Sequence, residues 1–269
     1  MLLVVYFTAG SALAAKRRAP EQSAPLQQNE PRRRAAPLSS CPVNSDALAQ
    51  SLKKSVAPSG GPSNGGFDNN EWAVVVDRQG SVCAVAFSGA KWQDQWLGSR
   101  NIAMAKANTA LEFSLDSKAI STANLYAGAQ PDGFLYGLPL SNPQPSPADS
   151  PRDAGSYGGD KDPFIGKRAG GVIVFGGGLA LYDENGLVGA LGVSGDTPCA
   201  DHNVAWRVRH DINLDHVKAG PNPKVRDGIV YDIGLSGKSE SGFGHPKCLG
   251  GETGIAADIG AGTGGGVLP

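Results

Sequence analysis

A stretch that otherwise has the composition of β-strands carries glycine at unusual places. It runs GGVIVFGGGLALYDENGLVGALGVSGD over residues 170–196, and its apolar runs and one turn predict three strands, at 171–175, 179–183 and 187–193. Glycine inside a strand costs conformational entropy and offers no side chain for packing. It therefore indicates a bend in the chain, or the close approach of another backbone or a flat ligand. The glycines in question are Gly176, Gly177, Gly178, Gly189 and Gly192.

The other elements expected around this stretch are helices and a second hairpin. Capping residues, apolar spacing and turn signals predict helices at 44–56, 99–116, 122–130 and about 200–210, and a hairpin at 72–89. The second helix carries Ala103, Ala107 and Ala110 on one face, where small side chains let a helix approach a sheet closely. This order of elements predicts an α/β (α+β) fold, an antiparallel sheet of about five strands covered by helices.

Patterning divides the 269 residues into four parts. A short apolar run ending in the A-x-A pattern Ala12-Leu13-Ala14 predicts a signal peptide at 1–15. A basic, proline-containing segment at 16–43 is expected to be a disordered tether. The domain is expected at 44–210, with an insertion at 139–168 that is too long for an ordinary connection. A glycine-rich extension occupies 211–269.

Composition narrows the class of protein. The net charge of −1 and the 40% hydrophobic content suit a soluble globular core and argue against a dedicated nucleic-acid binder. No apolar run approaches the ~20 residues that a membrane span needs, so none is expected. With the signal peptide, this predicts a periplasmic or extracellular protein.

The chain has four cysteines, whose spacing matches neither a zinc site nor a haem-attachment motif. An even number of cysteines in an exported protein indicates disulfides, and four allow three connectivities. We favour Cys41–Cys83 and Cys199–Cys248, each of which would tie a terminal segment to the core. Four buried thiols are the alternative.

Three segments together resemble the GlcG/HbpS-like haem-binding family. They are Val74-Val75-Val76-Asp77 with Gly80, then the helix pattern of Ala103, Lys106, Ala107, Thr109, Ala110 and Phe113, then Gly177-Gly178 with Asp183 and GLVGALGVSG at 186–195. The resemblance covers about residues 44–208. This sequence departs from the family pattern at Leu179, where proline is common, and at Asp201-His202, where an acidic pair is usual.

The resemblance implies a helix-covered antiparallel sheet, homo-oligomers and haem as the bound cofactor. Some members of the family are extracellular, and others are linked to glycolate use or corrinoid metabolism. On this reading, Gly176–Gly178 let the chain bend between strands, and Gly189 and Gly192 let the alanine-rich helix settle on the sheet. The same glycines, Gly177 and Gly178 above all, would leave room for a small planar ligand.

All four histidines lie late in the chain, and imidazole is the commonest axial ligand of haem iron. We name His202, His210 and His216 as cofactor-binding candidates, with His210 and His202 as the candidates for the metal. His202 and His210 lie ~12 Å apart along a straight helix and cannot easily share one iron. For any single histidine, a structural polar role is the commoner alternative. Tyr126, Tyr136 and Lys106 are weaker ligand candidates.

The run Asp211-Ile212-Asn213-Leu214-Asp215 begins like a calcium loop. His216 stands where that loop needs glycine, so we read the run as a turn or, at most, a weak cation site.

Three functions remain open from the sequence. The first is an exported haem-binding protein for haem sensing, storage or scavenging. The second is an exported enzyme that acts on a small metabolite or degrades haem, with polar groups at Asp201, His202 and His210. The third is a structural oligomer whose glycines serve packing alone. In the first case we expect the extension, held by Cys199–Cys248, to form part of the ligand-site wall, and 227–233 to add an edge strand.

Overall fold

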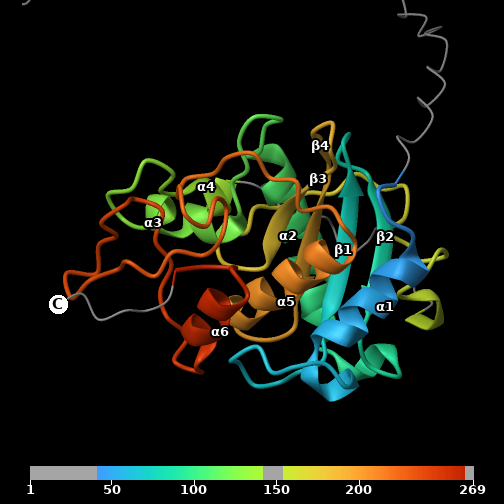
Figure 1. Cartoon of the computed structure of the whole chain (residues 1–269). Helices are drawn as coiled ribbons and strands as arrows, with labels where there is room; N and C mark the ends of the chain where they lie inside the picture. Colours follow the sequence, from blue (N-terminus) through green and yellow to red (C-terminus); the bar gives the residue numbers. More distant parts are fainter. Residues whose placement is uncertain (1–40, 142–153, 264–269) are drawn as a thin grey trace, which may run out of the picture. The chain divides into compact units, whose positions relative to one another are not determined.

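The computed structural model describes residues 41–141 and 154–263 (Figure 1). The expected signal peptide at 1–15, most of the expected tether at 16–43 and the middle of the insertion at 139–168 lie outside the described residues.

Two antiparallel hairpins make the sheet. In the first, β1 (Trp72–Asp77) pairs with β2 (Val82–Phe87), and in the second, β3 (Gly178–Tyr182) pairs with β4 (Leu187–Ser194). The hairpins join because β1 also pairs antiparallel with β4 along its whole length. The strand order is therefore β2-β1-β4-β3, which confirms the antiparallel sheet.

The sheet has four strands instead of about five, because residues 171–175 do not pair with it. Side chains of the neighbouring helix take up the backbone groups of this segment. Asn108 donates to the carbonyl oxygen of Gly171 at 3.1 Å, and the Thr109 hydroxyl accepts from the amide of Ile173 at 3.0 Å. These two backbone groups therefore bond to side chains of α2 in place of a partner strand.

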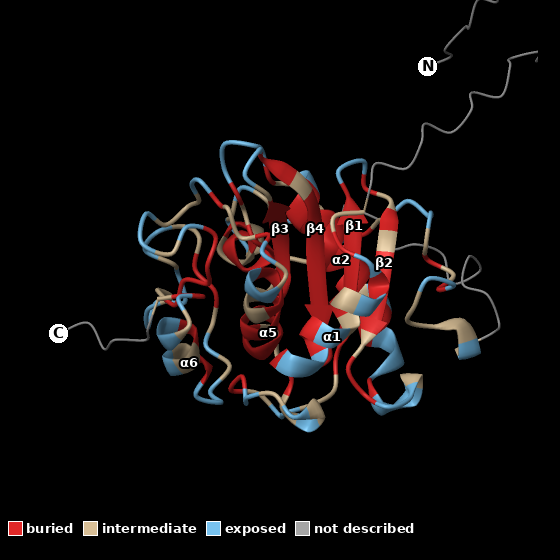
Figure 2. Cartoon of the chain, turned by 45° about the vertical axis from the view of Figure 1, so that its right-hand side comes forward, coloured by how far each residue is buried: buried red, intermediate tan, exposed pale blue. Residues whose placement is uncertain are grey.

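Helices cover both faces of the sheet (Figure 2). Because strand side chains alternate, Val74 and Val76 face α2 (Leu97–Glu112), whereas Ala73 and Val75 face α1 (Ser45–Ser55) and α5 (Pro198–Asp211). The sheet is therefore buried on both sides. The shorter elements are η1 (Ala57–Ser59), η2 (Trp92–Asp94), η3 (Thr122–Leu125), α3 (Tyr126–Ala129), α4 (Leu138–Ser141), η5 (Ala154–Ser156) and α6 (Glu252–Asp258). None of the helices in the described ranges is both long and apolar enough to cross a membrane.

Local sequence determines where α1 and α5 begin. The Asn44 side chain accepts from the amide of Ala47 at 2.8 Å, and the Thr197 hydroxyl accepts from the amide of Ala200 at 3.2 Å. Both are N-caps of the kind that the sequence predicts. Pro198 then occupies the first turn of α5, where its missing N–H costs no hydrogen bond.

Gly192 lets α2 lie directly on β4. A Cβ atom at this position would stand 1.9 Å from the carbonyl oxygen of Ala103, so this expectation is confirmed. The same expectation for Gly189 is wrong. Three residues along a strand reverse the direction of the side chain, and a Cβ there would meet the carbonyl oxygen of Val76 and the ring of Pro42 instead.

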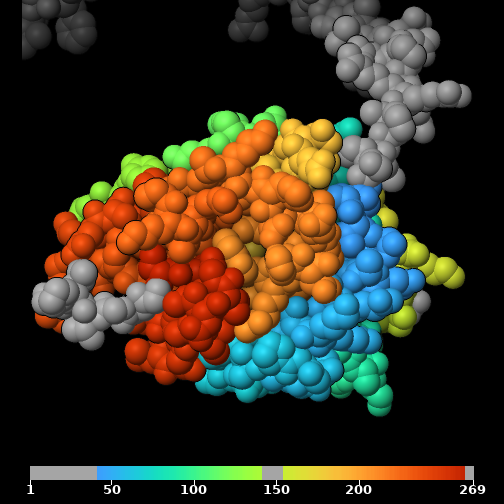
Figure 3. All heavy atoms as spheres, viewed as in Figure 1, coloured from blue at the N-terminus to red at the C-terminus, as the bar shows by residue number. Residues whose placement is uncertain are grey.

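Two disulfides close the fold, Cys41–Cys83 and Cys199–Cys248, which are the favoured pairings. The second holds the C-terminal extension, whose last part is red in Figure 3, against α5. A separate apolar cluster lies at this contact; it contains Ala123, Cys199, Ile229, Tyr231, Ala256 and Ala261. The extension is therefore part of the folded unit.

Residues 227–233 do not form the expected edge strand. Ile229 makes a single bridge to Gly262, and both its backbone partners, Ala261 and Thr263, belong to the extension itself. The extension also contains α6, which the sequence analysis did not predict. The Glu252 carboxylate anchors the start of that helix by accepting from the amides of Cys248, Leu249 and Gly250.

Candidate ligand site and buried polar centre

The structure separates the histidines. His202 and His245 are buried, at 0% and 1% exposure, whereas the His210 side chain is 77% exposed at the end of α5. His216 is half-buried, and its amide donates to the carbonyl oxygen of Tyr182 at 3.2 Å. The candidates named from the sequence therefore do not share one site.

His202 is enclosed in protein. Neither ring nitrogen makes a hydrogen bond within the described part of the chain, and the Trp206 ring lies 6.2 Å away. Burial lowers the pKa of His202 to about 3, helped by His245, and the Ala261 carbonyl only partly offsets this. The imidazole is neutral, and no ligand reaches it while the extension covers it.

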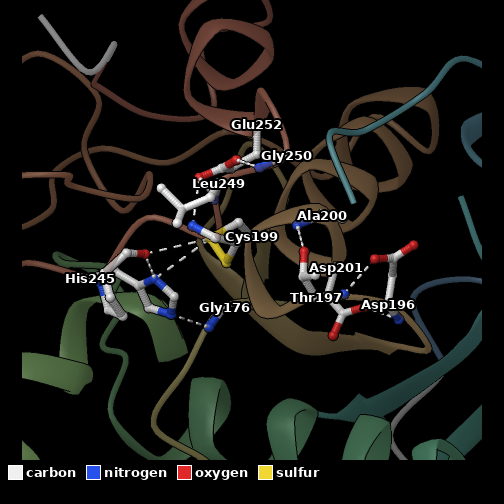
Figure 4. Close-up of a disulfide and its surroundings, with 12 residues drawn as sticks. Gly176, Asp196, Thr197, Cys199, Ala200, Asp201, His245, Leu249, Gly250 and Glu252 are labelled. Atoms are coloured by element: carbon white, nitrogen blue, oxygen red, sulfur yellow. Dashed lines mark hydrogen bonds between the residues drawn. A yellow bond between two sulfur atoms is a disulfide. The ribbon is translucent and has the colours of Figure 1, made fainter. Parts of the chain in front are cut away.

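His245, in the extension, is the buried histidine that the sequence analysis did not single out. Its Nε2 accepts from the amide of Gly176 at 3.2 Å, so Nδ1 carries the proton and donates to the carbonyl oxygen of Pro246 at 2.7 Å (Figure 4). The Tyr126 ring lies 5.2 Å away. His245 thus fastens the extension to the glycine break before β3, and no local pattern in the sequence marks this contact.

We expect His245 to make the fold acid-sensitive. Burial lowers its pKa from 6.5 to about 4. Because the folded pKa lies below the unfolded value, the unfolded chain takes up the proton first, and stability present above pH 6.5 is lost as the pH falls towards 4. The free energy of unfolding should fall by about 2 kcal/mol more between pH 7.5 and pH 5 than in His245→Gln. Urea unfolding at the two pH values measures this, and equal losses in both proteins would contradict it.

The glycine break is filled by protein atoms. A Cβ on Gly176 would lie 2.2 Å from the carbonyl oxygen of Pro198, and one on Gly178 would lie 2.4 Å from the Thr122 methyl group. Gly177 has a φ of +113°, a conformation that favours glycine, and faces Lys106. In this structure these glycines let the chain bend and pack closely.

A buried polar centre lies behind Gly177. Lys106 donates to Asp201 at 2.6 Å and to the carbonyl oxygen of Val193 at 3.0 Å. Burial raises the pKa of Asp201 to about 6, and Lys106 opposes that rise. Burial also raises the pKa of Glu71 well above its usual range, with the Asp201 charge adding to the effect. Lys106 is here a structural cation, not an exposed ligand. Glu71 was missed by the sequence analysis because only the fold brings it to this centre.

One open pocket lies between α1 and α5, beside the end of α6. Its volume of about 430 Å³ falls within the range of small-molecule sites. Helix α1 contributes Lys54 and Ser55, and the other lining residues are Pro62, Trp206, Arg207, His210, Asp211 and Ile259. Of the four histidines, His210 is the one at this pocket. We call it the α1–α5 pocket.

The ring of His210 is held by a carboxylate. His210 Nδ1 lies 2.7 Å from Asp215 Oδ2, which leaves Nε2 free of any partner within the described ranges. Asp211, at the other end of the calcium-like run, pairs with Lys54 at 3.6 Å. The two carboxylates thus serve different partners, as expected for a turn.

The two tyrosines named as weaker ligand candidates lie in different environments. Tyr126 is half-buried against His245, whereas Tyr136 is 67% exposed. Neither lines the α1–α5 pocket.

Comparison with known proteins identifies a family. A family model described as haem degrading protein HbpS-like matches residues 68–209, and a search of curated proteins found no match. Among solved structures, the PduOC:haem complex is 23% identical and aligns over 63% of this chain and 91% of its own, with a TM-score of 0.43. Klebsiella pneumoniae protein ORFY is 21% identical over 63% and 90%, with a TM-score of 0.42. A double mutant of Streptomyces reticuli HbpS is 13% identical over 70% and 96%, with a TM-score of 0.38. The family model covers more than half of the chain, including all four strands, and the chain belongs to the HbpS-like family.

Proposed function

We propose that this chain is an exported haem-binding protein and that haem occupies the α1–α5 pocket with His210 as an axial ligand. Membership of the HbpS-like family supports haem as the cofactor. Pro62, Trp206 and Ile259 give the pocket apolar surface beside the imidazole, which the ring of a porphyrin could contact. Ile259 belongs to the extension, so this proposal gives the extension a part in the ligand-site wall.

The contact between His210 and Asp215 is the observation that carries the assignment. A metal-binding histidine usually donates its second ring N–H to a carboxylate or carbonyl, which sets the tautomer and raises the basicity of the free nitrogen. Asp215 does this for His210 at 2.7 Å. Bound haem would supply an iron that this free nitrogen could ligate.

Export is part of the proposal, because disulfides persist mainly in oxidising compartments and the described residues contain two. Haem sensing, storage and scavenging all agree with such a site. The association of several copies is a further prediction, to be measured by light scattering of the purified protein.

We expect His210→Ala to weaken haemin binding by more than tenfold, and Asp215→Asn by about tenfold. The measurement is a titration of purified apo-protein with haemin, followed at the Soret band. His216→Ala is the matched control, because it removes a nearby imidazole that lies outside the pocket, and it should bind as the unmodified protein does. A Soret band unchanged in His210→Ala would refute the ligand assignment. No saturable binding by the unmodified protein would refute the proposed function.

The description of the matched family as haem degrading favours a second candidate, an enzyme that breaks down haem. The same titration distinguishes haem binding from haem degradation if the Soret band of the haemin-loaded protein is followed for hours in air with a reductant. A stable Soret band supports binding alone. Its decay, faster than that of free haemin under the same conditions, supports degradation.

A further inference from the structure

Arg207 is held in a fixed position in the α1–α5 pocket. Its Nε donates to the amide oxygen of Asn64 at 3.0 Å. Asn64 is itself buried, and its own NH₂ group donates to the carbonyl oxygens of Ser55 at 2.8 Å and Pro62 at 3.1 Å. With both amide hydrogens used, the Asn64 oxygen must point at Arg207. The guanidinium is therefore positioned before any ligand arrives.

The charge of Arg207 is not compensated within the described structure. Its terminal Nη1 and Nη2 groups have neither an ion pair nor a hydrogen bond to the residues of 41–141 and 154–263. The acidic residue that lines the pocket, Asp211, pairs with Lys54, and Asp215 pairs with His210. Arg207 is half-buried, and this desolvation lowers its pKa. A positioned, partly desolvated and unpaired guanidinium is suited to a carboxylate.

Arg207 also lies on the same side of α5 as His210. The two are three residues apart, which places them one turn apart on a helix surface, and both line the pocket. A ligand whose metal binds His210 can therefore place a carboxylate against Arg207.

We infer that Arg207 recognises a carboxylate of the pocket's ligand through its two terminal nitrogens. This rests on the proposed function, in which the ligand is haem and the carboxylates are its propionates. Arg207 is then the residue that selects acidic porphyrins over neutral ones, independently of the iron.

The test compares ligands that differ only in their carboxylates. Protoporphyrin IX and its dimethyl ester, both free of iron, are titrated against the protein by quenching of tryptophan fluorescence. Haemin and haemin dimethyl ester are titrated at the Soret band. We expect the unmodified protein to bind each free acid about tenfold more tightly than its ester. Arg207→Gln should lose that preference by binding the acids about tenfold more weakly and the esters unchanged.

Two further variants test whether the effect belongs to the Arg207 guanidinium or to positive charge in general. Lys53→Gln removes one positive charge from an exposed position on α1 outside the pocket and should keep the full preference. Arg207→Lys keeps the charge but not the paired donors and should keep part of it. Equal weakening of acids and esters in Arg207→Gln would overturn the inference, as would an unmodified protein that binds both equally.

Failure of the inference can be told apart from failure of the proposed function. Haemin binding that depends on His210 but not on Arg207 refutes only the role of Arg207. Binding of protoporphyrin IX that depends on Arg207, with haemin binding that ignores His210, refutes only the iron ligand. If the unmodified protein binds none of the four porphyrins, both are refuted.

Discussion

Replacement of both Cys199 and Cys248 by alanine is expected to lower the free energy of unfolding by about 4 kcal/mol. The bridge spans 49 residues and closes a loop that contains most of the extension. Without it, the unfolded chain regains the entropy of that loop. The folded chain keeps a small apolar cluster, the His245 contacts and the Arg209–Asp227 ion pair to hold the extension in place. Urea unfolding of the purified variant gives the loss.

The Cys41–Cys83 bridge provides the matched control. It spans 42 residues, so the chain-entropy estimate for its removal is nearly the same, also about 4 kcal/mol. The two variants should differ in which segment of the folded chain loses its protection from hydrogen exchange and proteolysis. Loss of Cys199–Cys248 should speed hydrogen exchange and proteolysis in 217–263, whereas loss of Cys41–Cys83 should leave that segment protected. If the extension stays equally protected in both variants, the bridge does not hold it in place.

The second large effect is expected at the ion pair of Arg209 and Asp227. Arg209 Nη1 lies 2.6 Å from Asp227 Oδ2, and Nη2 lies 3.0 Å from Oδ1, with both side chains almost fully buried. Nη1 also donates to the carbonyl oxygen of Ala180 in β3 at 3.1 Å. Arg209→Met leaves a buried carboxylate without its partner and should cost about 3–5 kcal/mol, measured by urea unfolding.

Two comparisons test this reasoning. Arg78→Met removes an arginine from the exposed pair with Asp116 and should cost less than about 1 kcal/mol. The double variant Arg209→Met/Asp227→Leu removes both buried charges and should recover much of the loss, since apolar pairs often replace buried ion pairs at little cost. A single variant as mild as Arg78→Met, or a double variant no better than the single, would show that the unpaired charge is not the cause.

Local signals in the sequence were sufficient for the hairpins and the long helices. The strands at 72–77 and 82–87 are short apolar runs on either side of a turn. Helices α1 and α5 begin at caps that can be recognised from neighbouring residues alone. The run at 171–175 has the same composition, but its backbone binds side chains of α2. Composition reports how apolar a segment is, and it does not report which partner satisfies its backbone.

The site was less predictable than the fold. The imidazole-rich region named from the sequence contains residues in opposite environments, with His202 enclosed and His210 exposed at a pocket. Helical spacing could separate these two, as the ~12 Å estimate did. It could not show that the extension covers one of them, nor that Asn64 would hold Arg207 from 143 residues away.

The sequence by itself determined the antiparallel α/β architecture, the family and the caps of α1 and α5, because each depends on residue type and short spacing. It favoured the observed pairing of the four cysteines, but the packing of distant segments decided that pairing. Only the tertiary structure decided the number of strands, the use of the glycines for packing, the burial of His202 and His245, and the location of the pocket at His210 and Arg207. These depend on contacts between segments far apart in the chain. Such contacts depend on which surfaces meet, and short-range residue patterns do not encode that information.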